Sequence, residues 1–162
     1  MYKKLIVVFF LFLANLIGCT EKQSTGEDFS FTTIDGEIKW LSDYRGKIVI
    51  VDFMGVNCQP CQYQLLELKK VYDEYGDKVE IISIDVWAVY GETADDVRSL
   101  LKAFEKASIP LNWTFGIDDG TLWNKYVVEK AVPTLYIFDE HGEQIFYEVG
   151  YTPYDKIVKY IA

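Results

Sequence analysis

The pattern of apolar and polar positions divides residues 47–86 into a strand, a helix and a second strand. Residues 47–53, KIVIVDF, and 78–86, KVEIISIDV, are apolar runs rich in β-branched side chains, which is typical of strands covered on both faces. Between them, residues 62–76, QYQLLELKKVYDEYG, carry apolar side chains at helical spacing and end at a glycine. This order predicts a βαβ unit.

Helices and strands continue through the second half of the chain. Residues 93–107 predict an amphipathic helix capped by Thr93, and residues 118–128 predict a turn and a short helix. Residues 131–151 contain two apolar runs joined by the polar turn DEHGE, which predicts a hairpin.

The last segment, residues 152–162, predicts a helix with Thr152 as its cap and Pro153 at its first position. A βαβ unit followed by a hairpin and a helix predicts an α/β fold, with a mixed central sheet flanked by helices. The 162 residues, 50% of them hydrophobic, suffice for one packed domain. Nucleic-acid binders carry an excess of basic residues on their surface, whereas this chain has a net charge of −9. We therefore expect no nucleic-acid partner.

The first twenty residues have the character of a targeting segment. Lys3 and Lys4 precede an apolar run at 5–17, which is shorter than the roughly 20 residues that span a bilayer. The run ends LIGC, which resembles the lipobox of prokaryotic lipoproteins, a family in which the signal is cleaved before the cysteine and the thiol is lipidated. This resemblance implies a lipid on Cys19. The alternative is an uncleaved anchor with an incidental cysteine.

Three segments follow from this interpretation. We expect a signal peptide at residues 1–18, a polar tether at 19–28 and a folded domain at 29–162. In either interpretation of the N-terminal segment, the domain lies outside the cytoplasm and is attached to a membrane.

The sequence NCQPCQ poses the main chemical question, because two cysteines so close could bind metal, form a structural bridge or exchange electrons. If Cys19 is lipidated, Cys58 and Cys61 are the remaining cysteines and His141 the only histidine, too few ligands for a tetrahedral zinc site. A bridge across two residues restricts the unfolded chain little. The redox interpretation is therefore favoured.

The neighbouring pattern supports redox chemistry at this motif. Cys58 lies where the first predicted strand meets the helix, and Pro60 falls in the first helical turn. Unpaired backbone N–H groups and the helix dipole stabilise a thiolate at such a position. Cys61, one turn further, is shielded and suited to resolve a mixed disulfide.

Two further residues stand out in the predicted strands. Asp52 places a carboxyl group in a strand that is expected to be buried. It is either a group at the strand end that reaches solvent, or a buried base that accepts the proton of Cys61. Pro133 opens an apparently interior strand, either as an ordinary strand-start proline or with a cis peptide bond after Val132.

The combination of these motifs resembles a known family. VDFMGVNCQPCQ, with VPT some seventy residues later, resembles the thioredoxin superfamily. Residues 29–53 are similar to the lead-in of its membrane-anchored extracytoplasmic branch, the TlpA/ResA-like thiol-disulfide oxidoreductases, and residues 91–118 match the insert of that branch. The resemblance covers roughly residues 28–160.

This resemblance implies a thioredoxin-like fold with an N-terminal strand extension and a helical insert. It implies Cys58 as the attacking cysteine, Cys61 as the resolving cysteine and Pro133 as a cis-proline beside them, with the Val132 backbone pairing with substrate. Asp52 matches the buried aspartate of thioredoxins. No cofactor is implied beyond the redox-active Cys58–Cys61 disulfide.

Three positions depart from the thioredoxin pattern. Asn57 replaces a tryptophan, and Gln59-Pro60 replaces Gly-Pro, so the substrate-facing surface and the reduction potential differ. The buried lysine of thioredoxins falls at Ile81 or Ile82. Without that cation, we expect desolvation to raise the pKa of the buried aspartate.

The leading functional hypothesis is a reductase of disulfides in secreted proteins, such as apocytochrome c. We expect a monomer that a membrane redox donor recharges and that is lipid-anchored on the extracytoplasmic face of a prokaryotic membrane. The rival enzymatic activity is that of a disulfide oxidant or isomerase. A peroxidase is disfavoured, because the threonine that peroxiredoxins carry three residues before the cysteine is missing. A lipid-anchored binding module without catalytic activity is the non-enzymatic alternative.

Overall fold

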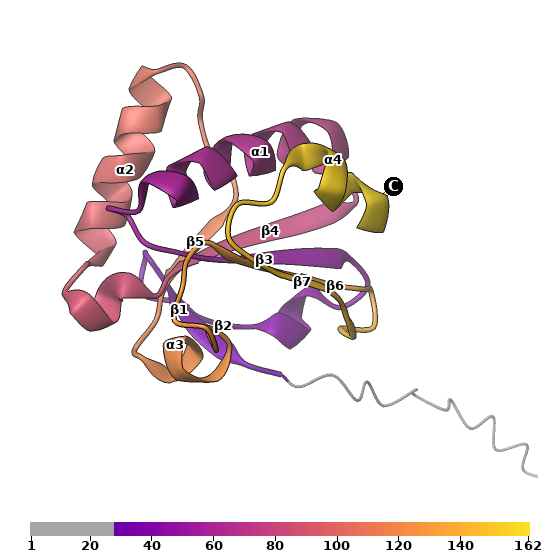
Figure 1. Cartoon of the computed structure of the whole chain (residues 1–162), viewed down its shortest axis with the longest axis horizontal. Helices are drawn as coiled ribbons and strands as arrows, with labels where there is room; N and C mark the ends of the chain where they lie inside the picture. Colours follow the sequence, from indigo (N-terminus) through magenta and orange to yellow (C-terminus); the bar gives the residue numbers. More distant parts are fainter. Residues whose placement is uncertain (1–27) are drawn as a thin grey trace, which may run out of the picture.

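A seven-stranded mixed sheet organises residues 28–162, the part of the chain that the computed structural model describes (Figure 1). The strand order is β2-β1-β5-β4-β3-β6-β7. The strands are β1 (Ser30–Thr33), β2 (Ile38–Trp40), β3 (Ile48–Met54), β4 (Val79–Asp85), β5 (Thr114–Ile117), β6 (Thr134–Phe138) and β7 (Gln144–Val149). The predicted signal peptide, Cys19 and the tether up to residue 27 lie outside the described residues.

The sheet combines a parallel centre with antiparallel flanks. β3, β4 and β5 are parallel, as the predicted βαβ unit requires, and β6 and β7 form the predicted hairpin. β1 and β2 pair antiparallel with each other, and β1 pairs with β5. These two strands are the expected N-terminal extension, so the predicted α/β, thioredoxin-like fold is confirmed.

Helices cover both faces of this sheet, with α1 and α4 on one side and α3 on the other (Figure 1). The helices are α1 (Gln59–Tyr75), α2 (Ala94–Lys106), α3 (Thr121–Lys125) and α4 (Tyr154–Ile157), with 3-10 turns η1 (Leu41–Tyr44), η2 (Trp87–Tyr90) and η3 (Val158–Tyr160). The expected helical insert corresponds to α2, whose N-cap is Thr93 as predicted. Within residues 28–162, none of these helices has the length and apolar character needed to cross a membrane.

The start of the C-terminal helix differs from the prediction. α4 begins at Tyr154, Pro153 is its N-cap with extended backbone angles, and Thr152 is not the cap. The reason is a long-range contact: the side chain of Gln64 accepts the N–H of Thr152 at 2.7 Å and donates to its carbonyl oxygen at 3.1 Å. This pairing holds residue 152 outside the helix.

The alternation of β3 decides which side chains face the dithiol helix. Val49, Val51 and Phe53 belong to the core cluster on the α3 side of the sheet. Ile50 and Met54 pack on the opposite side, with apolar residues of α1. Asp52 lies between them in the strand, so it shares the face that α1 covers.

Candidate active site

The two cysteines of the motif lie at the N-terminus of α1 and are joined as a disulfide. Cys58 is the N-cap residue, and its Sγ accepts the backbone N–H of Cys61 at 3.2 Å. Both cysteines are buried, with Cys58 5% exposed and Cys61 0%, so the order of exposure is the predicted one. Pro60 lies in the first turn, as the sequence indicated.

A turn before β6 lies against the outer cysteine. The Val132-Pro133 peptide bond is cis, as predicted. The carbonyl oxygen of Val132 lies 3.8 Å from the Sγ of Cys58, and the carbonyl oxygen of Pro133 accepts the N–H of Gly150 at 2.7 Å. The hairpin therefore brings residues some seventy positions away in sequence directly beside the dithiol.

The carboxyl group of Asp52 is fully buried, which excludes the strand-end alternative. Its Oδ2 accepts the hydroxyl of Ser83 at 3.2 Å, and Oδ1 has no hydrogen-bond partner among the described residues. Burial raises the pKa of Asp52 to about 7, and the Ser83 hydrogen bond opposes that rise. Desolvation is thus the main cause, as expected from the missing lysine.

The residue opposite the aspartate was not anticipated from the sequence. The parallel register of β3 and β4 pairs Asp52 with Ser83, whereas Ile81 and Ile82 lie opposite Ile50 and Val51. Ser83 in turn accepts the indole N–H of Trp113 at 3.1 Å. The indole thereby orients the hydroxyl group so that its proton points to the carboxyl group. The sequence analysis missed both residues because the contact depends on strand register.

The predicted substrate-facing residues form an exposed rim around the dithiol. Asn57, Gln59 and Pro60 are all exposed. The backbone N–H and the side-chain amide of Asn57 both donate to Glu92, at 2.9 and 2.6 Å. Glu92 comes from the segment between η2 and α2, and the sequence analysis did not identify it.

A second buried carboxyl group lies at the end of the neighbouring strand. Asp85 is 1% exposed, and its Oδ1 accepts the N–H of Trp87 at 2.9 Å. Burial, together with the nearby negative charge of Glu92, raises the pKa of Asp85 to about 8. The site therefore contains two carboxyl groups with raised pKa values, one more than the sequence indicated.

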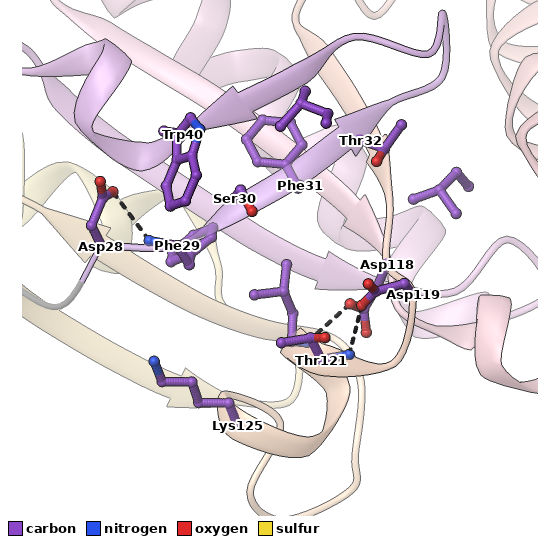
Figure 2. Close-up of a pocket in the computed structure, with 13 residues that line it drawn as sticks. Asp28, Phe29, Ser30, Phe31, Thr32, Trp40, Asp118, Asp119, Thr121 and Lys125 are labelled. Atoms are coloured by element: carbon purple, nitrogen blue, oxygen red, sulfur yellow. Dashed lines mark hydrogen bonds between the residues drawn. The ribbon is translucent and has the colours of Figure 1, made fainter.

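Two hollows differ in their relation to the dithiol. An apolar pocket of about 200 Å³ beside α1 is lined by Pro60, Tyr63, Leu66, Glu67 and Tyr151. Another hollow has a volume of about 360 Å³. It lies where strand β1 and the segment Asp118–Lys125 face each other (Figure 2). Its lining includes no member of the dithiol site.

Residues 28–162 hold no group of three or more His, Cys, Asp or Glu side chains that could bind a metal ion. The chemistry that the arrangement supports is thiol–disulfide exchange. The cysteine pair lies at a helix N-terminus, and Cys58 is slightly more exposed than the fully buried Cys61. With the cis-proline turn beside it and a buried carboxyl group on the same face, it defines a thioredoxin-like thiol-disulfide oxidoreductase.

The comparisons with known proteins agree with this class. The sequence profile of the AhpC/TSA family matches residues 23–144, and the chain belongs to that family. It is 30% identical over 126 residues to the thioredoxin-like protein YneN of Bacillus subtilis. The aligned region covers 78% of this chain and 69% of YneN. It is also 27% identical over 169 residues to the thiol-disulfide oxidoreductase ResA of Bacillus cereus, covering 96% of this chain and 92% of ResA.

Solved structures extend the similarity to the fold. A thioredoxin-like protein from Aeropyrum pernix superposes with a TM-score of 0.65 at 26% identity, covering 82% of this chain and 86% of that protein. The chain is therefore a thiol-disulfide oxidoreductase with the thioredoxin-like fold.

Proposed function

We propose that this enzyme reduces disulfide bonds in secreted proteins, of which apocytochrome c is one candidate, with Cys58 as the attacking cysteine and Cys61 as the resolving cysteine. The observation that carries the proposal is a fully buried Asp52 carboxyl group on the sheet face covered by the dithiol helix, with one oxygen that has no hydrogen-bond partner among residues 28–162. Such a group can accept the proton that the shielded Cys61 thiol loses when it attacks. The resemblance to ResA proteins supports the same assignment.

The first step is attack on the substrate. The Cys58 thiolate attacks one sulfur of the substrate disulfide, so that a mixed disulfide forms while the substrate S–S bond breaks. The other substrate sulfur leaves as a thiolate and takes a proton from water. The N-terminus of α1 supports this step, because the N–H of Cys61 points at the Cys58 sulfur and the helix has no acidic residue in its first turn.

The second step releases the product. Cys61 gives its proton to Asp52 and attacks the Cys58 sulfur, which breaks the mixed disulfide and releases the second substrate sulfur as a thiolate that takes a proton. The substrate gains two electrons and two protons, and the enzyme ends as the Cys58–Cys61 disulfide. A pKa of about 7 allows Asp52 to accept and release this proton at neutral pH.

A membrane redox donor closes the cycle in this proposal. A dithiol on that donor attacks the Cys58–Cys61 disulfide, becomes a disulfide itself and returns both thiols of the enzyme to the reduced state. The enzyme acts as a monomer with no further cofactor.

The surroundings of the dithiol offer contacts for an extended polypeptide. The backbone of Val132 would pair with the substrate chain as an added strand does, with Asn57, Gln59 and Pro60 along the rim. The adjacent pocket, whose lining includes Tyr63 and Tyr151, would take an apolar side chain near the substrate cysteine.

Attachment to the extracytoplasmic face of a prokaryotic membrane is part of the proposal and rests on the lipobox-like LIGC sequence. Cys19→Ser is expected to abolish lipid labelling and signal processing and to leave the domain fold unchanged. Absence of label on the wild-type protein in membrane extracts would contradict the anchor without affecting the redox assignment.

A trapping experiment tests the assignment of the two cysteines. Cys61→Ser is expected to accumulate a mixed disulfide through Cys58, and Cys58→Ser to accumulate none. Mass spectrometry of extracts after acid quenching identifies the trapped proteins, and the same adduct yield from both variants would contradict the assignment.

The reduction potential separates the reductase from the oxidant or isomerase. A value near the about −270 mV of thioredoxin is expected, whereas a value near the about −120 mV of strongly oxidising family members would contradict a reductase. Equilibration with a glutathione series measures it.

A further inference from the structure

The segment between α3 and β6 leads to the cis-proline turn and contains a lysine with an unusual backbone conformation. Among residues 28–162, the two non-glycine residues with positive φ are Ser108, at 64°, and Lys130, at 52°. Residues with a Cβ rarely occupy this left-handed region, where glycine or asparagine is the usual choice. Strained residues of this kind cluster at functional sites, so each of the two requires an explanation.

The end of a helix explains one of these residues and not the other. Ser108 follows the last turn of α2, and its N–H donates to the carbonyl oxygen of Glu105 at 2.9 Å. A left-handed residue at this position is a common way to end a helix. By contrast, α3 already ends at Lys125, and Lys130 lies in the irregular segment that follows. The reason for its conformation must therefore be sought in its side chain.

The side chain of Lys130 returns to α3. Its Nζ donates to the carbonyl oxygen of Trp123 at 2.7 Å and to Oδ1 of Asn124 at 3.3 Å. The same ammonium group lies 4.9 Å from the centroid of the Trp123 ring, within the range of a cation–π contact. These contacts form a clamp between Lys130 and α3, which the left-handed backbone makes possible by turning the side chain back along the chain.

α3 is a fixed base for this clamp. The carboxylate oxygens of the buried Asp118 accept the N–H groups of Leu122 and Trp123 at 2.9 and 2.8 Å. The N–H of Asp118 donates to the carbonyl oxygen of Asp85, the last residue of β4, at 3.0 Å. Trp123 itself belongs to the core cluster on this side of the sheet. The position of Lys130 is therefore set by the central sheet, through α3.

The chain after Lys130 leads directly to the dithiol. The carbonyl oxygen of Ala131 accepts the hydroxyl group of Thr134 at 2.7 Å, and this bond closes the turn that contains the cis peptide bond. Within the turn, the carbonyl oxygen of Val132 lies 3.8 Å from the Sγ of Cys58. A displacement of Lys130 would therefore displace the backbone that faces the outer cysteine.

We propose that Lys130 is a positioning residue for substrate binding: its clamp on α3 holds the Val132 backbone where an extended substrate chain can pair with it. This inference rests on the proposed reduction of protein disulfides by Cys58 and adds a residue that prepares the binding surface. The clamp contacts the backbone and side chains of α3 and neither of the two sulfurs. Its loss is therefore expected to weaken the binding of polypeptide substrates and to leave the chemistry of the cysteines unchanged.

Single-turnover kinetics of the reduced enzyme test this separation with two disulfide substrates. One is a single-cysteine peptide dimerised through its disulfide, and the other is hydroxyethyl disulfide, which has no peptide backbone to pair with Val132. Lys130→Met keeps the length of the side chain and removes its charge and its donors. It is expected to raise the half-saturating concentration of the peptide dimer about 2- to 30-fold, the usual range for a residue that acts through another. The limiting rate and the rate with hydroxyethyl disulfide are expected to stay unchanged.

Three further variants separate the clamp from the backbone strain. Lys130→Arg keeps a cation with donors and is expected to remain close to the wild type. Lys130→Gly relieves the left-handed backbone but removes the clamp, so it is expected to bind the peptide dimer as weakly as Lys130→Met. Ser108→Gly is the matched control, because it relieves the same backbone conformation at the end of α2. Its kinetics are expected to follow the wild type.

An unchanged half-saturating concentration in Lys130→Met and Lys130→Gly would overturn the inference, and so would a Lys130→Arg variant that binds as weakly as Lys130→Met. An equal loss of rate with both substrates would also overturn it, because such a loss indicates a general structural role. Should Lys130→Met not fold, Lys130→Gly alone decides. A wild type that does not react with the peptide dimer through Cys58 would overturn the proposed reduction itself, and the inference with it.

Discussion

Asp52 and Asp85 are buried carboxyl groups on adjacent strands, and they differ in the charge of their neighbours. Asp52 meets the neutral hydroxyl of Ser83, whose hydrogen bond lowers its pKa against the effect of burial. The nearby negative charge of Glu92 raises the pKa of Asp85 further. Burial alone therefore does not assign a role to a carboxyl group in this fold.

The difference decides which of the two can move protons at neutral pH. A pKa of about 7 leaves Asp52 divided between its two forms, which suits a group that accepts a proton and gives it back. A pKa of about 8 keeps Asp85 mostly protonated at neutral pH, so this group has little capacity to accept a further proton. We therefore expect Asp52, and not Asp85, to take part in the proton transfer.

The most direct test of the different roles of Asp52 and Asp85 is to remove the ability of each group to accept a proton. Asp52→Asn is expected to slow the resolving step by about 10- to 1,000-fold, the usual contribution of a general base, while the attack step changes less. Asp85→Asn is expected to slow resolution far less. Rapid acid quenching of the mixed disulfide with a peptide substrate measures both, and equal slowing by the two variants would contradict the separate roles.

The pH dependence of stability compares the same two groups without any substrate. The pKa of Asp52 is raised from 3.8 to about 7, so the folded protein binds this proton more tightly than the unfolded chain does. The protonated Asp52 therefore contributes fully to the free energy of unfolding below pH about 4, and this contribution is lost as pH rises through about 7. For a shift of this size, the free energy of unfolding falls by up to about 4 kcal/mol. Asp52→Asn is therefore expected to stabilise the reduced protein at pH 8 by about 2 kcal/mol, since the amide leaves its own donors unpaired.

Urea unfolding of the reduced protein from pH 4 to pH 9 checks this expectation. The proton on Asp85 also stabilises the fold, and this contribution is lost at a higher pH than that of Asp52, as pH rises through about 8. Asp85→Asn should abolish this second decrease in the free energy of unfolding. A free energy of unfolding that is flat across this range in the wild type would contradict the raised pKa of both groups.

Removal of the hydroxyl group opposite Asp52 tests the role of its neutral neighbour, with a smaller expected effect. Ser83→Ala removes the hydrogen bond that lowers the pKa of Asp52, so that pKa is expected to rise by about one unit. The pH at which resolution reaches half its maximal rate should rise with it. A carbon-13 titration of the Asp52 carboxyl carbon measures the shift, and a fall in the pKa would contradict the role of Ser83.

The indole behind that hydroxyl is expected to have the smallest effect. Trp113→Phe removes the donor to Ser83 and leaves its hydroxyl free to turn, so the pKa of Asp52 is expected to rise by less than about half a unit. The same carbon-13 titration applies. A shift larger than that of Ser83→Ala would show that Trp113 acts through packing and not through the hydroxyl group.

The sequence by itself determined the parts of this protein that depend on local pattern. The apolar run of β3, the helix that follows and the cysteines at their junction are neighbours in the chain, so their periods and spacing predict the buried Asp52 and the helix-capping Cys58. The cis bond before Pro133 was also predicted, because a proline at the start of an interior strand is unusual.

Tertiary structure alone decided the contacts that join distant segments. Ser83 lies opposite Asp52 because of the parallel register of β3 and β4, and a shift of one residue in either direction, which the sequence does not exclude, would place an isoleucine there. Glu92 reaches the loop of Asn57 across 35 positions, and Gln64 displaces the start of α4 across 88. The spacing of apolar residues determines which face of a helix or strand is buried. Hydrogen bonds between polar groups of distant elements depend on how those elements are placed relative to one another, and only the packing of the fold determines that placement.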